Sequence, residues 1–349
     1  MEAVQYKCPN CGGGLKFNAD KQDFLCEYCD SVFKEEDFFK KDDALENESP
    51  EAESVERQEY ENAVLYSCPS CGAQVITDET TAATTCYYCS NPVVLSGKLS
   101  GELRPDMIIP FKIDKKDAIN KFKEMCGKKK FLPKNFVAES HLEEIKGVYF
   151  PYWYIDCKTN GSINATSRQV RTWVTGDHQH TETTVRGHFR QGDMQITNMP
   201  EAALKGKDRD LMRYVCPFNS ADFVPFSMSY LSGYFAERRN IESAEIEAGV
   251  TQKIRHFSEE KLEKSIDYVN VSIKDSSINV GSLSWRYNLL PVWVLSYKHK
   301  DKNYLYALNG QTGKVYGELP VCSKKLAGLF AGVAAGASLI FSVLGVLLF

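Results

Sequence analysis

Apolar and polar residues between about 101 and 322 recur at the spacings of both strands and helices. Alternating and aromatic runs predict strands at 148–155, 167–174, 181–189, 270–273 and 292–297. Apolar positions at helical spacing predict a helix over about 244–264, and Asp114 can cap a second helix that runs to about Met125. The sequence N-G-Q-T-G between 304–308 and 314–316 predicts a hairpin. This pattern predicts an α+β body over residues 101–322.

The last 24 residues, Leu326–Phe349, contain no charged side chain. As a helix they would extend roughly 36 Å, which exceeds the thickness of a hydrocarbon core of about 30 Å. We therefore expect one C-terminal transmembrane helix at 326–349. Lys324 and Lys325 stand just before it, and the positive-inside rule then places the N-terminal bulk in the cytoplasm. The expected location is the cell membrane, with a single pass.

Three glycines in this segment, Gly328, Gly332 and Gly336, are each four residues apart. A stripe without side chains lets a second membrane helix pack closely, so the stripe favours a homo- or hetero-oligomer through this helix. The alternative is that glycine is simply frequent in membrane helices.

The body shows a hint of internal duplication, with related segments at 101–165 and 222–320. In each, a Pro-Phe pair (Pro110-Phe111 or Pro225-Phe226) precedes a helix and then a Pro-x-Trp strand. The second Pro-x-Trp strand is at Pro291–Trp293, and the first at Pro151–Trp153. We expect these aromatic residues to pack in the core and not to bind a cofactor.

Charge divides the 349-residue chain, whose net charge is −4, into distinct parts. Residues 34–62 carry twelve acidic and four basic side chains and are interpreted as a solvated acidic linker. From residue 101 onward, 34 Lys and Arg stand against 27 Asp and Glu. This basic surplus could contact the acidic linker or an anionic lipid surface, and ordinary surface charge explains it equally well.

Eight of the twelve cysteines form one pattern written twice, C-x2-C-x14-C-x2-C. The first copy is Cys8, Cys11, Cys26 and Cys29, and the second is Cys68, Cys71, Cys86 and Cys89. Two C-x-x-C pairs at this separation are typical of a four-cysteine zinc site. Pro9, Gly12, Pro69 and Gly72 supply the bends. The spacing predicts two small β zinc ribbons, at 1–33 and 63–97.

Disulfide-stapled hairpins are the alternative interpretation of these cysteines. Met1–Phe17 contains no continuous apolar run of the kind that a secretory signal needs, so we expect reduced thiols and bound Zn2+. Because all ligands are cysteines, neither of the two sites has an open position, and both are expected to be structural. Metal binding would supply on the order of 10 kcal/mol or more to the folding of each ribbon.

Few other motifs indicate chemistry. The chain lacks G-x-x-x-x-G-K-[ST], G-x-G-x-x-G, G-x-S-x-G and H-E-x-x-H, so no motor or hydrolase signature is present and no catalytic residue is assigned. His178, His180 and His188 fall on alternate positions of a predicted strand and could hold a metal, but no fourth ligand is evident. Exposed histidines on a polar strand are the commoner case.

Zinc ribbons often bind nucleic acid, but the charge of this segment argues against that function. Residues 1–100 contain eight basic and nineteen acidic residues, a net −11, whereas a phosphate-binding module needs the opposite sign. An acidic segment held by metal is better suited to protein docking.

The Y-x-C-P-x-C-G and C-x-Y-C repeats, the Pro-x-Trp strands and the terminal apolar segment together resemble a bacterial family. It is the family of Firmicutes membrane-tethered double-zinc-ribbon proteins, labelled after a transcription factor IIB-type zinc ribbon or the primosomal helicase N′. The resemblance implies partners of the envelope-stress response: a phage-shock-protein A homologue, a flotillin-like SPFH protein and a TPM-domain-type membrane protein. It implies no catalytic residue.

Three functions follow from these patterns, in order of preference. The first is a non-enzymatic, membrane-anchored scaffold or adaptor that recruits envelope-stress proteins through the ribbons and the body. The second is a membrane-tethered zinc-ribbon protein that binds nucleic acid. The third is an enzyme with a site in the body, around His178 and His188.

Overall fold

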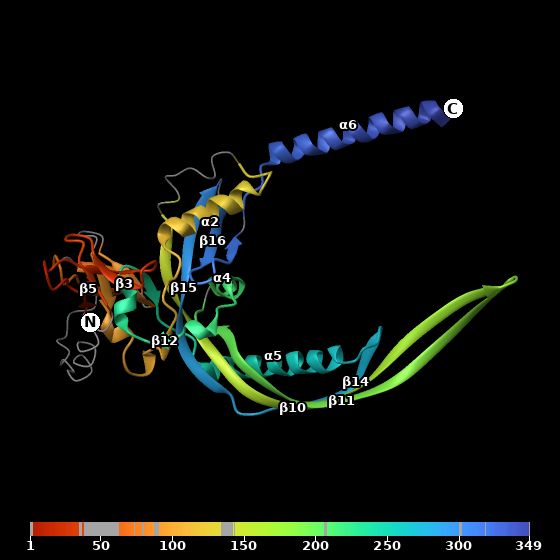
Figure 1. Ribbon diagram of the computed structural model, residues 1–349, viewed down its shortest axis with the longest axis horizontal. Helices are drawn as coiled ribbons and strands as arrows, with labels where there is room; N and C mark the ends of the chain where they lie inside the picture. Colours follow the sequence, from red (N-terminus) through yellow and green to blue (C-terminus); the bar gives the residue numbers. More distant parts are fainter. Residues whose placement is uncertain are drawn as a thin grey trace. The chain divides into compact units, whose positions relative to one another are not determined.

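The computed structural model describes residues 3–34, 37, 63–72, 74–78, 80–86, 91–133, 142, 144–205, 208–299, 302–317 and 319–348. The chain forms two compact units (Figure 1). Unit 1 comprises Met1–Phe150, Gly206–Arg238 and Leu289–Phe349, and unit 2 comprises Pro151–Lys205 and Arg239–Asn288. Most of the predicted acidic linker at 34–62 lies outside the described residues.

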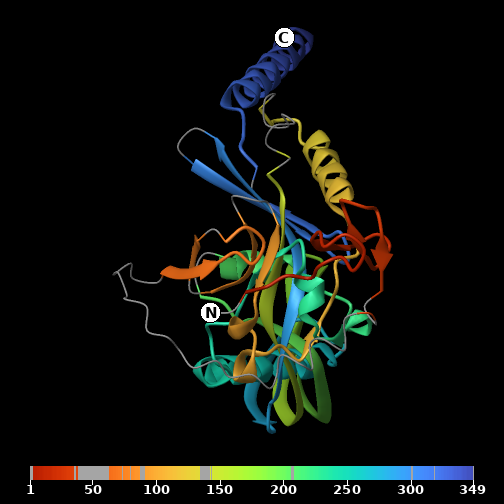
Figure 2. The same ribbon diagram turned by 90° about the vertical axis from the view of Figure 1, so that its left-hand side faces the viewer.

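The N-terminal part of unit 1 contains two small antiparallel sheets, seen in red and orange in Figure 2. The first consists of β2 (Leu15–Asn18), β3 (Asp23–Cys26) and β4 (Val32–Phe33), and the second of β5 (Ala63–Ser67) and β6 (Gln74–Asp78). In the register of β2 and β3, Leu15 lies opposite Cys26, so a buried apolar residue and a cysteine share one face. Local hairpins thus form in both cysteine-rich segments.

One larger sheet of twelve strands joins the rest of the β structure, in the order β1-β8-β7-β13-β10-β15-β16-β17. Off this path, β11 and β14 pair with β10, β12 pairs with β9, and β9 also pairs with β15. The strands are β1 (Ala3–Val4), β7 (Thr81–Thr85), β8 (Pro92–Leu95), β9 (Met107–Ile108), β10 (Lys146–Thr175), β11 (His178–Ala202), β12 (Val224–Pro225), β13 (Phe235–Glu237), β14 (Val271–Val280), β15 (Ser284–His299), β16 (Lys302–Asn309) and β17 (Val315–Gly317).

This sheet corrects the predicted fold class of two small zinc ribbons, an α+β body and a transmembrane helix. The chain is a mixed α/β structure with a large sheet, and its described residues contain four α-helices. Residues 63–97 do not form one small ribbon, because β7 and β8 belong to the large sheet while β5 and β6 form their own. The small side chains of β7 permit this arrangement, with Ala83 opposite Ala236 of β13.

The core of unit 1 is aromatic, as the sequence predicts for the Pro-Phe and Pro-x-Trp segments. Phe111 stacks on Tyr234 with ring centroids 4.3 Å apart, and Tyr149 and Trp293 each lie 5.0 Å from Phe111. All four rings are buried. The indole N–H of Trp293 donates to the carbonyl of Ile113, so the one polar atom of this side chain is satisfied.

The helices of unit 1 follow their sequence signals where these are local. Helix α2 (Lys115–Gly127) begins where Asp114 accepts a hydrogen bond from the Asp117 amide, which confirms the predicted cap. Helix α4 spans Asp208–Val215, and short 3-10 helices lie at Ser96–Lys98, Gly101–Leu103, Ser220–Asp222 and, as η6, at Met228–Leu231. The predicted hairpin near the end of the body is β16 and β17.

Unit 2 is built on a long antiparallel ribbon, in which β10 pairs with β11 on one side and β14 on the other (Figure 1). The strands predicted at 148–155 and 167–174 are thus parts of one strand. Helix α5 (Ser243–Lys264) covers one face, where Leu262 of the helix and Ile266, just after its end, pack with Ile163 and Ala165. On the same strand, Gly161 leaves room for the side chain of Ile278 of β14, whose Cδ1 would lie 2.3 Å from a Cβ at this position.

The C-terminal segment forms helix α6 (Ser323–Leu348), whose side chains are described as far as Ser338. Among the residues that the structure describes, no helix is long and apolar enough to cross a membrane. Nine of the residues 326–338 are Gly, Ala or Ser, whose small side chains contribute little apolar surface. The predicted transmembrane helix, and with it the single-pass location in the cell membrane with a cytoplasmic N-terminal bulk, is wrong.

The glycine stripe of α6 has open surroundings. A Cβ placed at Gly328, Gly332 or Gly336 meets no described atom within 4 Å. The helix pairing predicted for these glycines stays a prediction.

Candidate metal centres

The four cysteines of the first group converge, as their spacing predicts. Their sulfurs lie within 4.8 Å of one another, with Cys8 Sγ 3.6 Å from Cys29 Sγ and Cys11 Sγ 3.4 Å from Cys26 Sγ. Tetrahedral zinc with Zn–S bonds of about 2.3 Å separates its sulfurs by about 3.8 Å. The spacing of these thiols therefore fits one Zn2+ ion held by four thiolates.

Tight turns aim the first pair of sulfurs inward. The amide of Gly12 donates to the Cys8 carbonyl at 2.8 Å, and the amide of Gly72 repeats this bond to Cys68 at 2.9 Å. Gly12 and Gly72 have φ of +76° and +73°, a conformation that side chains disfavour. The same turn is therefore written twice in the sequence and formed twice in the structure.

Without a bound cation, two thiols of the first group have widely different pKa values. The hydroxyl and the backbone amide of Ser31 hold the pKa of Cys29 down at about 6. For Cys11 the Gly13 amide favours the thiolate, but hydrogen bonds with the thiols of Cys26 and Cys29 outweigh it and raise the pKa to about 12. Thiolates this close repel one another, and a bound dication would remove that penalty. Ser31 belongs to no sequence motif that would predict its contact with Cys29.

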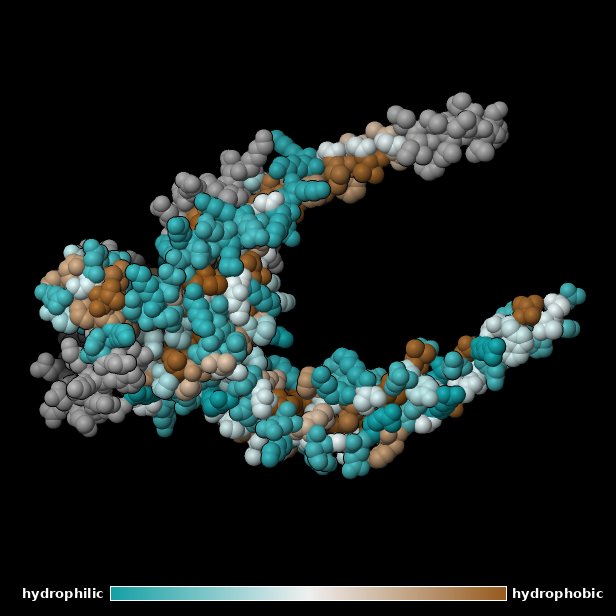
Figure 3. Space-filling model, in the orientation of Figure 1, coloured by the Kyte–Doolittle hydropathy of each residue, from teal (hydrophilic) through white to brown (hydrophobic). Residues whose placement is uncertain are grey.

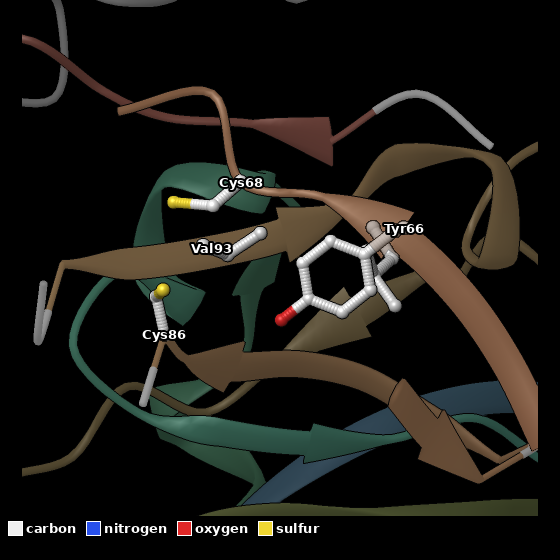
Figure 4. Close-up of a cluster of buried hydrophobic side chains, with 5 residues drawn as sticks. Tyr66, Cys68, Cys86 and Val93 are labelled. Carbon is white, nitrogen blue, oxygen red and sulfur yellow. The ribbon is translucent and has the colours of Figure 1, made fainter. Parts of the chain in front are cut away.

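The second group shows the same arrangement in the part that is described. The sulfurs of Cys68, Cys71 and Cys86 lie within 4.8 Å of one another, with 3.8 Å between Cys71 and Cys86. Cys89, the predicted fourth ligand, lies outside the described residues. Cys68 and Cys86 are buried beside Tyr66, Val93 and Leu95 (Figure 4). This apolar shell shields the sulfurs of Cys68 and Cys86 from water, while Cys71 is exposed.

The first cysteine group is joined to the core of unit 1 by hydrogen bonds on both sides of its first hairpin. The Phe17 amide donates to the Ser232 carbonyl at 3.0 Å, and the Ser232 hydroxyl donates to the Leu15 carbonyl. The Gln22 side chain donates to the carbonyl of Phe111 at 2.7 Å. The hairpin is therefore not an independent module.

The three histidines predicted as weak metal candidates do not converge in this way. His188 Nε2 lies 2.8 Å from the Ser167 hydroxyl, and the His180 ring stacks on Trp173 with centroids 5.4 Å apart. In the part of the chain that the structure describes, the cysteine groups are where metal-ligand atoms gather. His180 and His188 are better explained as partners of their neighbours across the strands.

Unit 2 also contains an open cavity of about 360 Å³ that sequence did not indicate. Arg186 donates to the Tyr268 hydroxyl at its wall, at 2.9 Å, and lies over the ring of that tyrosine. The cavity is lined by Ser167, Gln169, Thr184, Arg186, Ile266, Asp267, Tyr268 and Val269. The cavity is open, and its wall carries the opposite charges of Arg186 and Asp267. Its lining residues contain no arrangement of nucleophile, base and oxyanion donor.

Comparison with known proteins identifies one full-length relationship. The chain is 31% identical over 347 residues to a Bacillus subtilis (strain 168) protein described as the uncharacterized protein YdjG, covering 99% of this chain and 98% of that protein. The chain belongs to the YdjG family. The relationship spans both the cysteine-rich segments and unit 2, so the family shares this whole length. Neither a family model nor a solved structure matches the chain.

Proposed function

We propose that this member of the YdjG family is a non-enzymatic scaffold in which two structural Zn2+ ions hold protein-docking surfaces in their folded form. The observation that carries the proposal is the closed cluster of Cys8, Cys11, Cys26 and Cys29, whose sulfurs match tetrahedral zinc. Four thiolates leave no position for water or substrate, so such a metal stabilises structure and does not catalyse.

The attachment of the first cysteine hairpin to unit 1 gives the metal a role beyond its own loop. Hydrogen bonds from Phe17 and Gln22 connect this hairpin to Ser232 and Phe111. Loss of the metal would therefore loosen both the hairpin and the surface of unit 1 on which it rests. A docking surface built from these elements would depend on zinc.

The surface chemistry favours proteins over nucleic acid as partners. Residues 1–100 carry a net charge of −11, which repels phosphate backbones. The family resemblance noted from the sequence suggests a phage-shock-protein A homologue, a flotillin-like SPFH protein and a TPM-domain-type protein as the partners to test.

The test is a co-purification from the native host with the intact protein, Cys8→Ser, Cys68→Ser and the control Cys126→Ala. Cys126 is a buried thiol of helix α2, distant in sequence from both groups, and alanine keeps its site small and apolar. We expect the proposed partners to be lost with the Cys8 and Cys68 variants and retained with Cys126→Ala. Equal recovery with all four proteins would rule out a zinc-dependent scaffold, and recovery of nucleic acid with steep salt dependence would favour the nucleic-acid function.

A further inference from the structure

Strand β11 of unit 2 has one edge that no described strand covers. It is 25 residues long and pairs with β10 alone, so its outer backbone N–H and C=O groups face away from the sheet. Such an edge is a template for a further strand. Polar and apolar side chains mix along this ribbon on the face in view in Figure 3.

Three of the devices that protect an edge, namely lysine, proline and a bulge, are missing from most of β11. Residues 178–195 contain neither Lys nor Pro, and their register with β10 runs without a bulge from His178 to Ile196. β-branched residues concentrate in the first third of β11, at Thr181, Thr183, Thr184 and Val185. By contrast, β14 at the other edge of the ribbon has ten residues, one bulge and Lys274. The edge of β11 is therefore the better suited of the two for strand addition.

We propose that β11 of a second copy of this chain pairs antiparallel with β11, about a two-fold axis at Thr184. In this register Glu182 of each copy lies opposite Arg186 of the other copy. The two-fold axis therefore produces this ion pair twice. On the opposite face Thr183 and Val185 lie opposite each other twice, a favourable β-branched pair. The occupant is a second copy because the strand is complementary in charge to itself.

The side chains are placed for these contacts. Glu182 and Arg186 are four residues apart on one strand and share a face, and both are exposed. The Tyr268 hydroxyl, which accepts a hydrogen bond from one guanidinium nitrogen at 2.9 Å, orients Arg186 and leaves its other donors for a carboxylate. Moving the axis to Arg186 would place this arginine opposite itself, which like-charge repulsion opposes.

The test is sedimentation of the full chain over a range of concentrations. We expect the wild-type mass to rise toward twice that of one chain. Glu182→Arg and Arg186→Glu should each weaken association about tenfold or more, because each places like charges opposite one another twice. The double variant E182R/R186E exchanges the charges and should restore the dimer, which a merely misfolded ribbon would not do.

Asp275→Lys is the matched control, since it makes the same kind of charge change on exposed β14 at the other edge of the ribbon. It should leave the dimer unchanged. A wild-type chain that stays monomeric at every concentration overturns the proposal, as does a dimer that resists both single reversals. A dimer lost only with Asp275→Lys would assign the contact to β14 instead. None of these outcomes depends on zinc-dependent recruitment, so the two proposals can fail separately.

Discussion

Phe17 lies edge to face with Tyr230, with ring centroids 5.1 Å apart and an angle of 77° between the rings. Phe17 belongs to β2 of the first cysteine hairpin, whereas Tyr230 belongs to η6, more than 200 residues later in the chain. Both rings are buried, and Phe24 of β3 packs against both of them. The cysteine hairpin therefore shares its apolar core with unit 1.

This shared core predicts that Phe17→Ala destabilises unit 1 and not the hairpin alone. Removing a buried phenylalanine typically lowers the free energy of unfolding by about 3–5 kcal/mol, through lost burial and the cavity left behind. Urea unfolding followed by tryptophan fluorescence would report it, because Trp293 lies in the same unit. Val32→Ala is the control: Val32 is 49% exposed, and we expect a change within about 0.5 kcal/mol. A Phe17→Ala protein as stable as this control would show that the hairpin folds on its own.

The contact between Phe17 and Tyr230 also shows where sequence reasoning succeeds and fails. Signals carried within a few residues were found: the cysteine spacing, the Asp114 cap of α2, the helical period of α5 and the hairpin of β16 and β17. Pairings between distant segments were not, such as β7 with β13. Small residues like Ala83 and Ala236 carry no local signal for the strand they will meet.

The membrane prediction failed for a different reason. It rested on the absence of charge and on the length of 326–349, whereas a spanning helix also needs strongly apolar side chains, and nine of the residues 326–338 are only Gly, Ala or Ser. At the candidate metal centres, by contrast, the spacing predicted the four cysteines that the structure brings together in the first group. It could not reveal Ser31, which contacts Cys29 only because the turn places it there.

Zinc content gives the second prediction. The intact protein should contain two Zn2+ ions, Cys8→Ser and Cys68→Ser one each, and Cys126→Ala two. Because the metal binds only the folded groups, a chelator should lower the melting temperature of the intact protein and that of Cys126→Ala equally. Metal analysis with thermal unfolding would measure both. Two ions in Cys8→Ser, or a melting temperature that chelation leaves unchanged, would contradict the assignment.

A third prediction concerns the ion pair of Asp156 and Arg286 in unit 2. Asp156 accepts a hydrogen bond from Arg286 at 2.7 Å and another from the Asn198 amide at 2.6 Å, and Arg286 also donates to the Asn198 side chain. Arg286→Ala would leave the carboxylate and the amide oxygen without this donor. We expect a loss of about 1–3 kcal/mol in the free energy of unfolding, measured by urea titration.

The exposed pair of Glu124 and Lys128 on helix α2 is the comparison for Arg286→Ala. Both of its side chains are mostly exposed, and exposed pairs four residues apart on a helix contribute only about 0.3–0.5 kcal/mol. Lys128→Ala should therefore have a small effect. Equal effects of Lys128→Ala and Arg286→Ala would mean that the three-residue network in unit 2 adds nothing beyond an ordinary surface pair.

The fourth prediction is a stability loss in acid that depends on Asp222. The Lys112 ammonium, 2.7 Å away, and the Gln311 side chain both donate to this carboxylate and lower its pKa. A carboxylate whose pKa is lower in the folded state stabilises the protein above its unfolded pKa of about 4, and this stabilisation is lost as the pH falls through the lowered folded value. Asp222→Asn cannot titrate. The melting temperature of this variant should therefore fall less than that of the wild type when the pH is lowered from about 6 to about 3. Lys112→Met should reduce the acid sensitivity in the same direction, since it removes the main cause of the shift. If the wild type and both variants lose stability in parallel over this range, other carboxylates control the acid response of the protein.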